Sequence, residues 1–166
     1  MKVAMTNPRS TASIAGHPIH PMLIPFPIAF FVATLACDIA FWITGAAAWV
    51  TATLWLLGVG IILGLLAALA GLTDVLGEAR IRALPPVWWH AGGNLIVVLI
   101  EAGNWYVRFA SGSAGVLPTG IILSAIVVCL LLFTGWKGWE MVYRGRAGVA
   151  DEPAVVLRDE TPRRAA

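Results

Sequence analysis

Four apolar stretches constrain the fold of this chain more than any other feature. They lie near residues 23–44, 49–72, 87–107 and 117–138. A helix needs about 20 apolar residues to cross the hydrocarbon core of a bilayer. Charged residues make up 12% of the chain, against about 25% in soluble domains. The sequence therefore predicts an all-α fold, a four-helix transmembrane bundle, with the lipid bilayer as its main partner.

The segments that flank these spans are short. Residues 1–15 form a predicted cytoplasmic N-terminal tail, residues 16–143 the four-span membrane domain, and residues 144–166 a polar cytoplasmic tail that we expect to be disordered. The first residues are too polar for a signal peptide, and no small-residue cleavage site follows a short apolar core. The first span is therefore expected to stay in the mature protein.

Basic residues predict the orientation of the spans. An excess of Lys and Arg marks cytoplasmic loops. With both termini in the cytoplasm, only Arg108 lies at the outer end. The inner side then holds the other basic residues, namely Lys2, Arg9, Arg80, Arg82, Lys137, Arg144, Arg146 and the arginines of the tail. We therefore expect an N-in, C-in topology.

A histidine-proline segment precedes the first span. Residues 16–21 are Gly-His-Pro-Ile-His-Pro, and proline biases the preceding residue toward extended geometry. We therefore expect His17 and His20 in a stiff, mostly non-helical segment at the cytoplasmic surface. The predicted topology brings His90, at the inner start of the third span, and Asp74, at the inner end of the second, to the same surface.

Two interpretations of these residues stay open. Neutral imidazole is the commonest metal ligand, so His90 with His17 or His20 would ligate heme b or a transition-metal ion. Asp74 would then orient one imidazole, and Asn94 lies one turn beyond His90 on the same helix face. The alternative is a structural knot, in which the histidines and Asp74 hydrogen-bond to carbonyl groups that the prolines leave exposed. The spacing of the two leading histidines does not decide between them.

Span three has a polar stripe. At 100° per residue, its markedly polar side chains fall within an arc of about 80°. Such a stripe is expected to face the interior of the bundle or a wet cavity, because lipid contact would be costly. Its members are His90, Asn94, Glu101, Asn104 and Arg108.

A second acid, Asp38 on span one, lies at a depth similar to Glu101. Two acids at one depth cannot both be charged cheaply, so one holds a proton or a cation such as Arg108 lies near them. One interpretation is a proton path or proton-coupled redox site, formed by Asp38, Glu101, Asn104 and Arg108, that links the outer acids to the inner histidines. The other is a buried pair that sets the helix register.

Span two has small residues at four-residue steps, Gly60, Gly64 and Ala68. Such a ridge lets helix backbones approach closely. It predicts helix packing within the bundle, or contact with another membrane subunit or a second copy of the chain.

Several separate motifs resemble those of a bacterial family of four-span inner-membrane proteins of unknown function. They are the Gly-His-Pro-x-His-Pro signature with Pro25-Phe26-Pro27, Gly-Leu-Thr-Asp at 71–74, His90 with Asn94, and Gly-Trp-Lys-Gly-Trp-Glu-Met-Val-Tyr-Arg at 135–144. The resemblance covers roughly residues 14–149. It implies a multi-pass fold in the bacterial inner membrane and no particular activity. Where the family is expected to have a histidine shortly after the Tyr-Arg pair, this chain has Gly145, which leaves three candidate imidazoles.

The leading functional hypothesis is a small membrane redox protein, or a subunit of a redox complex, that is not an enzyme on its own. Its cofactor would be heme b or a metal ion. One alternative is a non-catalytic structural or assembly subunit of a larger membrane complex. Another is a small-ion or solute carrier, although the chain has no repeated half. No phosphate loop, nucleotide fingerprint or catalytic-triad order is present, and no nucleic-acid partner is expected.

Overall fold

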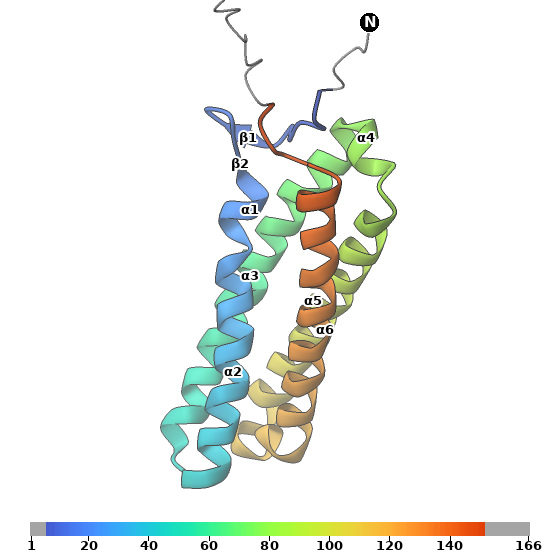
Figure 1. The fold of residues 1–166 in the computed structure, drawn as a ribbon. Coiled ribbons are helices and arrows are strands. Elements are labelled where there is room, and N and C mark those ends of the chain that lie inside the picture. The colour runs from blue at the N-terminus through green and yellow to red at the C-terminus, as the bar shows by residue number, and fades with distance from the viewer. Residues whose placement is uncertain (1–5, 152–166) are drawn as a thin grey trace, which may run out of the picture.

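In the described part of the chain, four long helices lie side by side (Figure 1). The computed structural model describes residues 6–151. The long helices are α2 (Pro25–Thr44), α3 (Ala47–Gly77), α5 (Pro85–Ser111) and α6 (Ile121–Trp139). Contacts join α2 to α3, α3 to α5, α5 to α6 and α6 to α2, so the four helices make a closed ring. The predicted all-α class is confirmed.

Short elements connect these helices at both ends of the ring. A two-stranded antiparallel hairpin leads into the first helix, and irregular helical turns join α5 to α6. The short elements are β1 (Ser13–Ile14), β2 (His17–Pro18), α1 (Ile19–Leu23), α4 (Ala79–Arg82), η1 (Gly112–Gly115), η2 (Val116–Gly120) and η3 (Glu140–Arg144).

Three described stretches are long and apolar enough to cross a membrane: Ile19–Thr44, Ala47–Gly77 and Pro85–Arg144. The third is 60 residues long and includes both α5 and α6. It reverses direction between them, through η1 and η2 (Figure 1).

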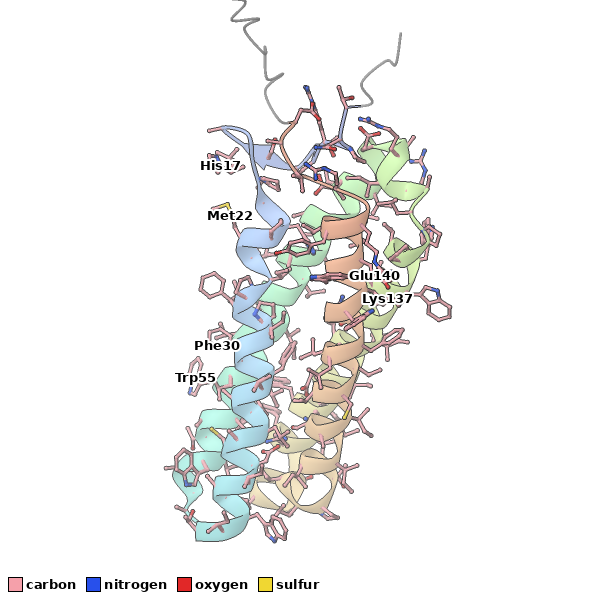
Figure 2. All side chains as sticks on the ribbon, viewed as in Figure 1. His17, Met22, Phe30, Trp55, Lys137 and Glu140 are labelled. Carbon is pink, nitrogen blue, oxygen red and sulfur yellow. The ribbon has the colours of Figure 1, made fainter. Side chains whose placement is uncertain are left out.

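The exterior of the ring is apolar and the interior is partly polar. Trp55 is 72% exposed and projects outward from α3 (Figure 2). Among the described residues, the fully buried side chains include Glu101 and Arg108 as well as Phe31 and Leu57. This arrangement is typical of proteins in a lipid bilayer. Lipid tails offer no hydrogen-bond partners, so polar side chains find theirs inside the protein.

The first helix begins earlier than the predicted 23–44. Pro18 is the N-cap of α1, and Pro21 lies in its first turn, where the missing N–H of proline breaks no helical hydrogen bond. The expected non-helical geometry is therefore wrong for His20, which is helical, whereas His17 is extended in β2. Pro25 then begins α2, and Ile24 between the two helices keeps helical dihedral angles.

The two ends of the described chain meet at the hairpin end of the ring. The N–H of Asn7 donates to the Asp151 carboxylate over 2.7 Å, and the N–H of Gly148 donates to the Pro8 carbonyl over 2.8 Å. Residues 145–151, part of the tail expected to be disordered, therefore lie against the N-terminal segment. Residues 1–5 and 152–166 lie outside the described residues.

Candidate functional site

Two of the three histidines, His20 and His90, form a pair at the hairpin end of the ring. Their ring centroids are 5.9 Å apart and their planes cross at 79°. Nδ1 of His20 hydrogen-bonds to the carbonyl of Ala67 on α3 over 2.7 Å, and Nδ1 of His90 hydrogen-bonds to the carbonyl of Thr134 on α6 over 2.9 Å. A carbonyl only accepts, so each Nδ1 is the protonated nitrogen. Each Nε2 is then left with a free lone pair.

Glycines make room for both imidazoles. A Cβ at Gly71 would lie 3.0 Å from Nδ1 of His20, and a Cβ at Gly138 would lie 3.2 Å from Nδ1 and Cε1 of His90. The Nδ1–Cε1 edge of each ring therefore rests against a helix backbone. The edge that contains Nε2 is turned away from that backbone, and the structure gives Nε2 no protein hydrogen-bond partner among the described residues.

The structure does not bring His17 to this pair. His17 is exposed, its Nδ1 is 3.0 Å from the carbonyl of Ala15, and its side chain projects outward from the hairpin (Figure 2). Within residues 6–151, no group of three or more His, Cys, Asp or Glu side chains is arranged to hold a metal ion. The protein groups available to a ligand here are therefore the two Nε2 atoms.

Asp74 has partners other than the histidines. Its Oδ1 accepts hydrogen bonds from the N–H of Ala12 over 2.7 Å, from the hydroxyl of Ser10 over 2.8 Å and from the hydroxyl of Thr11 over 3.3 Å. Asp74 thus attaches the N-terminal segment to the end of α3. The expected role of orienting an imidazole belongs instead to backbone carbonyls.

Asn94 supports the pair from behind His90. Its Nδ2 donates to the carbonyl of His90 over 2.8 Å, and its Oδ1 accepts from the hydroxyl of Thr134 over 3.3 Å. Thr134 therefore contacts α5 twice, once through its hydroxyl and once through the carbonyl that holds His90. This double contact fixes α5 against α6 beside the pair.

A second polar group, here called the charged cluster, lies in the other half of the ring. It consists of Asp38, Glu101, Asn104, Arg108 and Ser124, all of them fully buried. The Arg108 guanidinium donates to both oxygens of Asp38, from Nη1 over 2.5 Å and from Nη2 over 2.8 Å. Such bidentate pairs are the strongest Arg–carboxylate geometry. This pair joins α2 to α5 across the centre of the ring.

Amide and hydroxyl groups complete the charged cluster. Asn104 accepts from Nε of Arg108 over 2.9 Å and donates to Oε2 of Glu101 over 2.9 Å. Ser124 on α6 donates to Oδ2 of Asp38 over 2.8 Å and accepts from Nη2 of Arg108 over 3.1 Å. The cluster thus connects three helices, and the interior orientation predicted for this part of the stripe is confirmed.

The topology prediction places Arg108 at the outer end of its span, but the structure buries Arg108 inside the ring. Residues 112–120 fold back over its guanidinium. Glycine is needed at the two positions of closest approach, Gly115 and Gly120. A Cβ at Gly120 would lie 2.8 Å from Nη2 of Arg108, and a Cβ at Gly115 would lie 2.6 Å from the carbonyl oxygen of Val107. The burial of Arg108 depends on a partner, Asp38, that lies 70 residues away in sequence.

An apolar layer separates the histidine pair from the charged cluster. It consists of Phe31, Leu57, Val97 and Val127, one residue from each long helix. On α5, Val97 lies between Asn94 and Glu101, and on α6, Val127 lies between Ser124 and Thr134. The described hydrogen bonds do not cross this layer. The predicted proton path between the two polar groups therefore has no continuous chain of polar side chains.

Packing within the chain uses most of the small-residue ridge on α3. A Cβ at Gly60 would lie 2.7 Å from Cε1 of Phe31, and a Cβ at Gly64 would lie 3.4 Å from Cγ2 of Val98. Ala68 is exposed. Two of the three residues thus bring α3 close to α2 and α5, which leaves one for contact with another subunit.

Sequence reasoning missed Ser124 and Thr134. Both are isolated hydroxyl residues within the apolar stretch of α6. A Ser or Thr hydroxyl in a helix can hydrogen-bond to a carbonyl of the preceding turn, so it does not by itself indicate a partner on another helix. No signal in the sequence identifies them, because their hydrogen bonds to Asn104 and Asn94 depend on which residues of the neighbouring helix face them.

Comparison with known proteins gives one match. The model of a family described as "Predicted membrane protein (DUF2231)" matches residues 16–151. No curated protein matches the chain, and no solved structure matches it. The matched region begins at the histidine-proline segment and includes both the histidine pair and the charged cluster. Since it covers most of the sequence, the chain belongs to the DUF2231 family of predicted membrane proteins.

Proposed function

We propose that this protein is a small redox protein, or a subunit of a redox complex, in the bacterial inner membrane, and that His20 and His90 ligate one transition-metal centre. The observation that supports this most is the state of the two rings. Each Nδ1 is held by a carbonyl, and each Nε2 keeps a free lone pair. In metal-ligating histidines the other ring nitrogen commonly donates a hydrogen bond of this kind, which sets the tautomer and raises the basicity of the ligating nitrogen.

The spacing of the pair suits one shared metal atom. Two imidazole nitrogens on one metal lie at most about 4 Å apart, because each bond is about 2 Å long. A ring-centroid separation of 5.9 Å with crossed planes is compatible with such ligation. The site supplies only neutral nitrogens, which suit copper, iron, zinc and nickel rather than hard cations such as calcium or magnesium.

Electron transfer is the chemistry that two histidine ligands favour. If the cofactor is heme, His20 and His90 would hold it, and it would supply one-electron transfer. A bare ion would complete its coordination with water or with a group from a partner subunit. The proposed cofactor is still heme b or a metal ion, and its proposed protein ligands are now His20 and His90 without His17.

The proposed membrane arrangement has four spans with both termini in the cytoplasm. Asn7 and Asp151 are hydrogen-bonded at the hairpin end, so the described ends of the chain share one side. Arg80, Arg82 and Arg144 belong to that end, whereas residues 44–48 and 109–120, which form the opposite end, contain no Lys or Arg. The positive-inside rule then assigns the hairpin end to the cytoplasm.

A structural role is the second candidate, and the hydrogen bonds of the rings support it. The His20 ring joins α1 to α3, and the His90 ring joins α5 to α6. A subunit that needed only these bonds would bind no metal.

Metal content and visible absorption of the purified full-length protein test the proposal. We expect about one metal atom or heme per chain, lost in His20→Ala and in His90→Ala and retained in the matched surface variant His17→Ala. A protein that is colourless and metal-free after expression with excess iron, copper and heme would contradict the proposal. Equal metal content in all three variants would contradict it as well.

A further inference from the structure

We infer that Glu101 is a proton-binding site, with its proton on Oε1. Glu101 is fully buried, and Oε1 is the one buried side-chain polar atom among the described residues that lacks a hydrogen-bond partner. Its other oxygen, Oε2, accepts a hydrogen bond from Nδ2 of Asn104. The carboxyl group therefore has one satisfied acceptor and one unpartnered position.

The charges around Glu101 are already balanced without it. The charged groups of the cluster are Asp38 on α2 and Arg108 on α5, and they form a bidentate pair. Arg108 directs its remaining nitrogen, Nε, to Asn104 and makes no hydrogen bond to Glu101. An ionised Glu101 would add a buried charge with no partner, which is far costlier than one unpaired hydroxyl group.

The other elements supply no compensating charge. Helix α3 has no titratable side chain between Ala47 and Thr73, α6 contributes the hydroxyl of Ser124, and residues 112–120 contain no charged group. On the side toward the histidine pair lies the apolar layer defined above. Nothing on any facing helix would therefore stabilise a second carboxylate.

A proton suits this position better than a metal cation. Hard cations take six or more oxygen ligands, whereas Glu101 offers one free oxygen and its neighbours are already engaged with one another. A bound proton needs only that oxygen. Release of this proton would require a new cation or water beside Arg108, so proton occupancy at Glu101 is coupled to the charge balance of the Asp38–Arg108 pair. This inference does not depend on metal binding at the other end of the ring.

Infrared spectroscopy of the full-length protein in lipid tests this inference. Exposed carboxyl groups are ionised at neutral pH, since they titrate near pH 4. We expect a carbonyl band of a protonated carboxylic acid at neutral pH that shifts in D₂O. The band should be lost in Glu101→Gln, which keeps the size of the side chain and its neutrality. It should be kept in the control variant Glu140→Gln, because the Glu140 carboxylate is paired with Lys137.

Three results would overturn the inference. The first is a wild-type spectrum with no protonated-acid band at neutral pH. The second is a band that persists in Glu101→Gln, because the proton would then belong to another acid. The third is failure of Glu101→Gln to fold, since a neutral isostere is tolerated where the native group is itself neutral.

Discussion

At the scale of single residues, the polar interior is divided into groups with different chemistry. The histidine pair supplies two neutral nitrogens with free lone pairs, and the charged cluster supplies a closed ion pair next to one excess acid. In both groups, the partners lie on different helices. Each group therefore holds the ring together and also provides an atom that is open to a ligand, Nε2 in one and Oε1 of Glu101 in the other.

The Asp38–Arg108 pair is expected to be essential for stability. Asp38→Asn keeps the shape of the side chain but leaves the buried Arg108 charge without a counterion, and breaking a buried pair in this way costs about 3–5 kcal/mol. Ser124→Ala leaves the ion pair in place and removes the hydrogen bonds of one neutral hydroxyl, so we expect a smaller loss. Denaturant titration in detergent gives both free energies of unfolding. Equal losses in the two variants would refute the assigned role of the pair.

The sequence predicted which face of a helix each polar side chain lies on, because helical periodicity determines that face. It did not predict the partner of a side chain when that partner lies on another helix. The 100° rotation per residue places Glu101, Asn104 and Arg108 on one face, and all three are buried. Periodicity says nothing about which residue of another helix faces them. Periodicity therefore predicted neither the pairing of Arg108 with Asp38 nor the carbonyl partners of the His20 and His90 rings.

At the scale of elements, proline and glycine determine where helices begin and how closely they pack. Pro18, Pro21 and Pro25 all lie at helix starts. Gly45 ends α2 in the left-handed conformation, at φ 67°, which favours glycine and permits the tight turn into α3. The sequence predicted the four long helices from hydropathy. It placed both ends of the second and third inside the observed ends of α3 and α5, because polar residues such as Asp74 continue a helix when a partner satisfies them. It started the fourth at 117, whereas α6 begins at Ile121.

The short helix α4 has a pH-dependent cap. Arg80 donates to the Glu78 carboxylate from its side chain and from its backbone N–H, and these bonds lower the pKa of Glu78 from 4.5 to about 2. A lowered pKa in the folded state means that the stabilisation is complete above about pH 4.5 and is lost as the pH falls toward 2. We therefore expect the amide of Arg80 to lose protection from hydrogen exchange over that range.

Glu78→Gln supplies the control for this prediction. The amide cannot ionise, so exchange at Arg80, corrected for the intrinsic pH dependence of exchange, should become insensitive to pH between 4.5 and 2. An unchanged pH dependence in the variant would assign the effect to another group.

At the scale of the whole molecule, a ring of four helices presents apolar side chains outward and brings both described chain ends to one side. The family match supports a membrane protein and names no activity. The features of the molecule that bear on function are the histidine pair and the charged cluster, together with their positions along the proposed spans. The sequence predicted the fold class and the outward apolar faces because both follow from hydropathy. It did not predict the apolar layer that separates the two groups, because that layer forms only when four helices meet.

Cysteine accessibility tests the proposed topology. In a chain with Cys37 and Cys129 replaced by Ala, Ala46→Cys and Ser113→Cys should both react with a membrane-impermeant maleimide added outside spheroplasts. Ser13→Cys should react only after the membrane is permeabilised. Reaction of Ala46→Cys and Ser113→Cys from opposite sides would contradict the four-span arrangement.

X-ray absorption at the metal edge tests whether His20 and His90 share one metal. In the purified full-length protein, the account predicts nitrogen scatterers at about 2.0–2.1 Å with the outer-shell signature of two imidazoles. His20→Ala should remove the metal and with it the two-imidazole signature, and His17→Ala should leave both unchanged. A metal whose coordination shell contains no imidazole, or a shell that His20→Ala does not alter, would contradict the account.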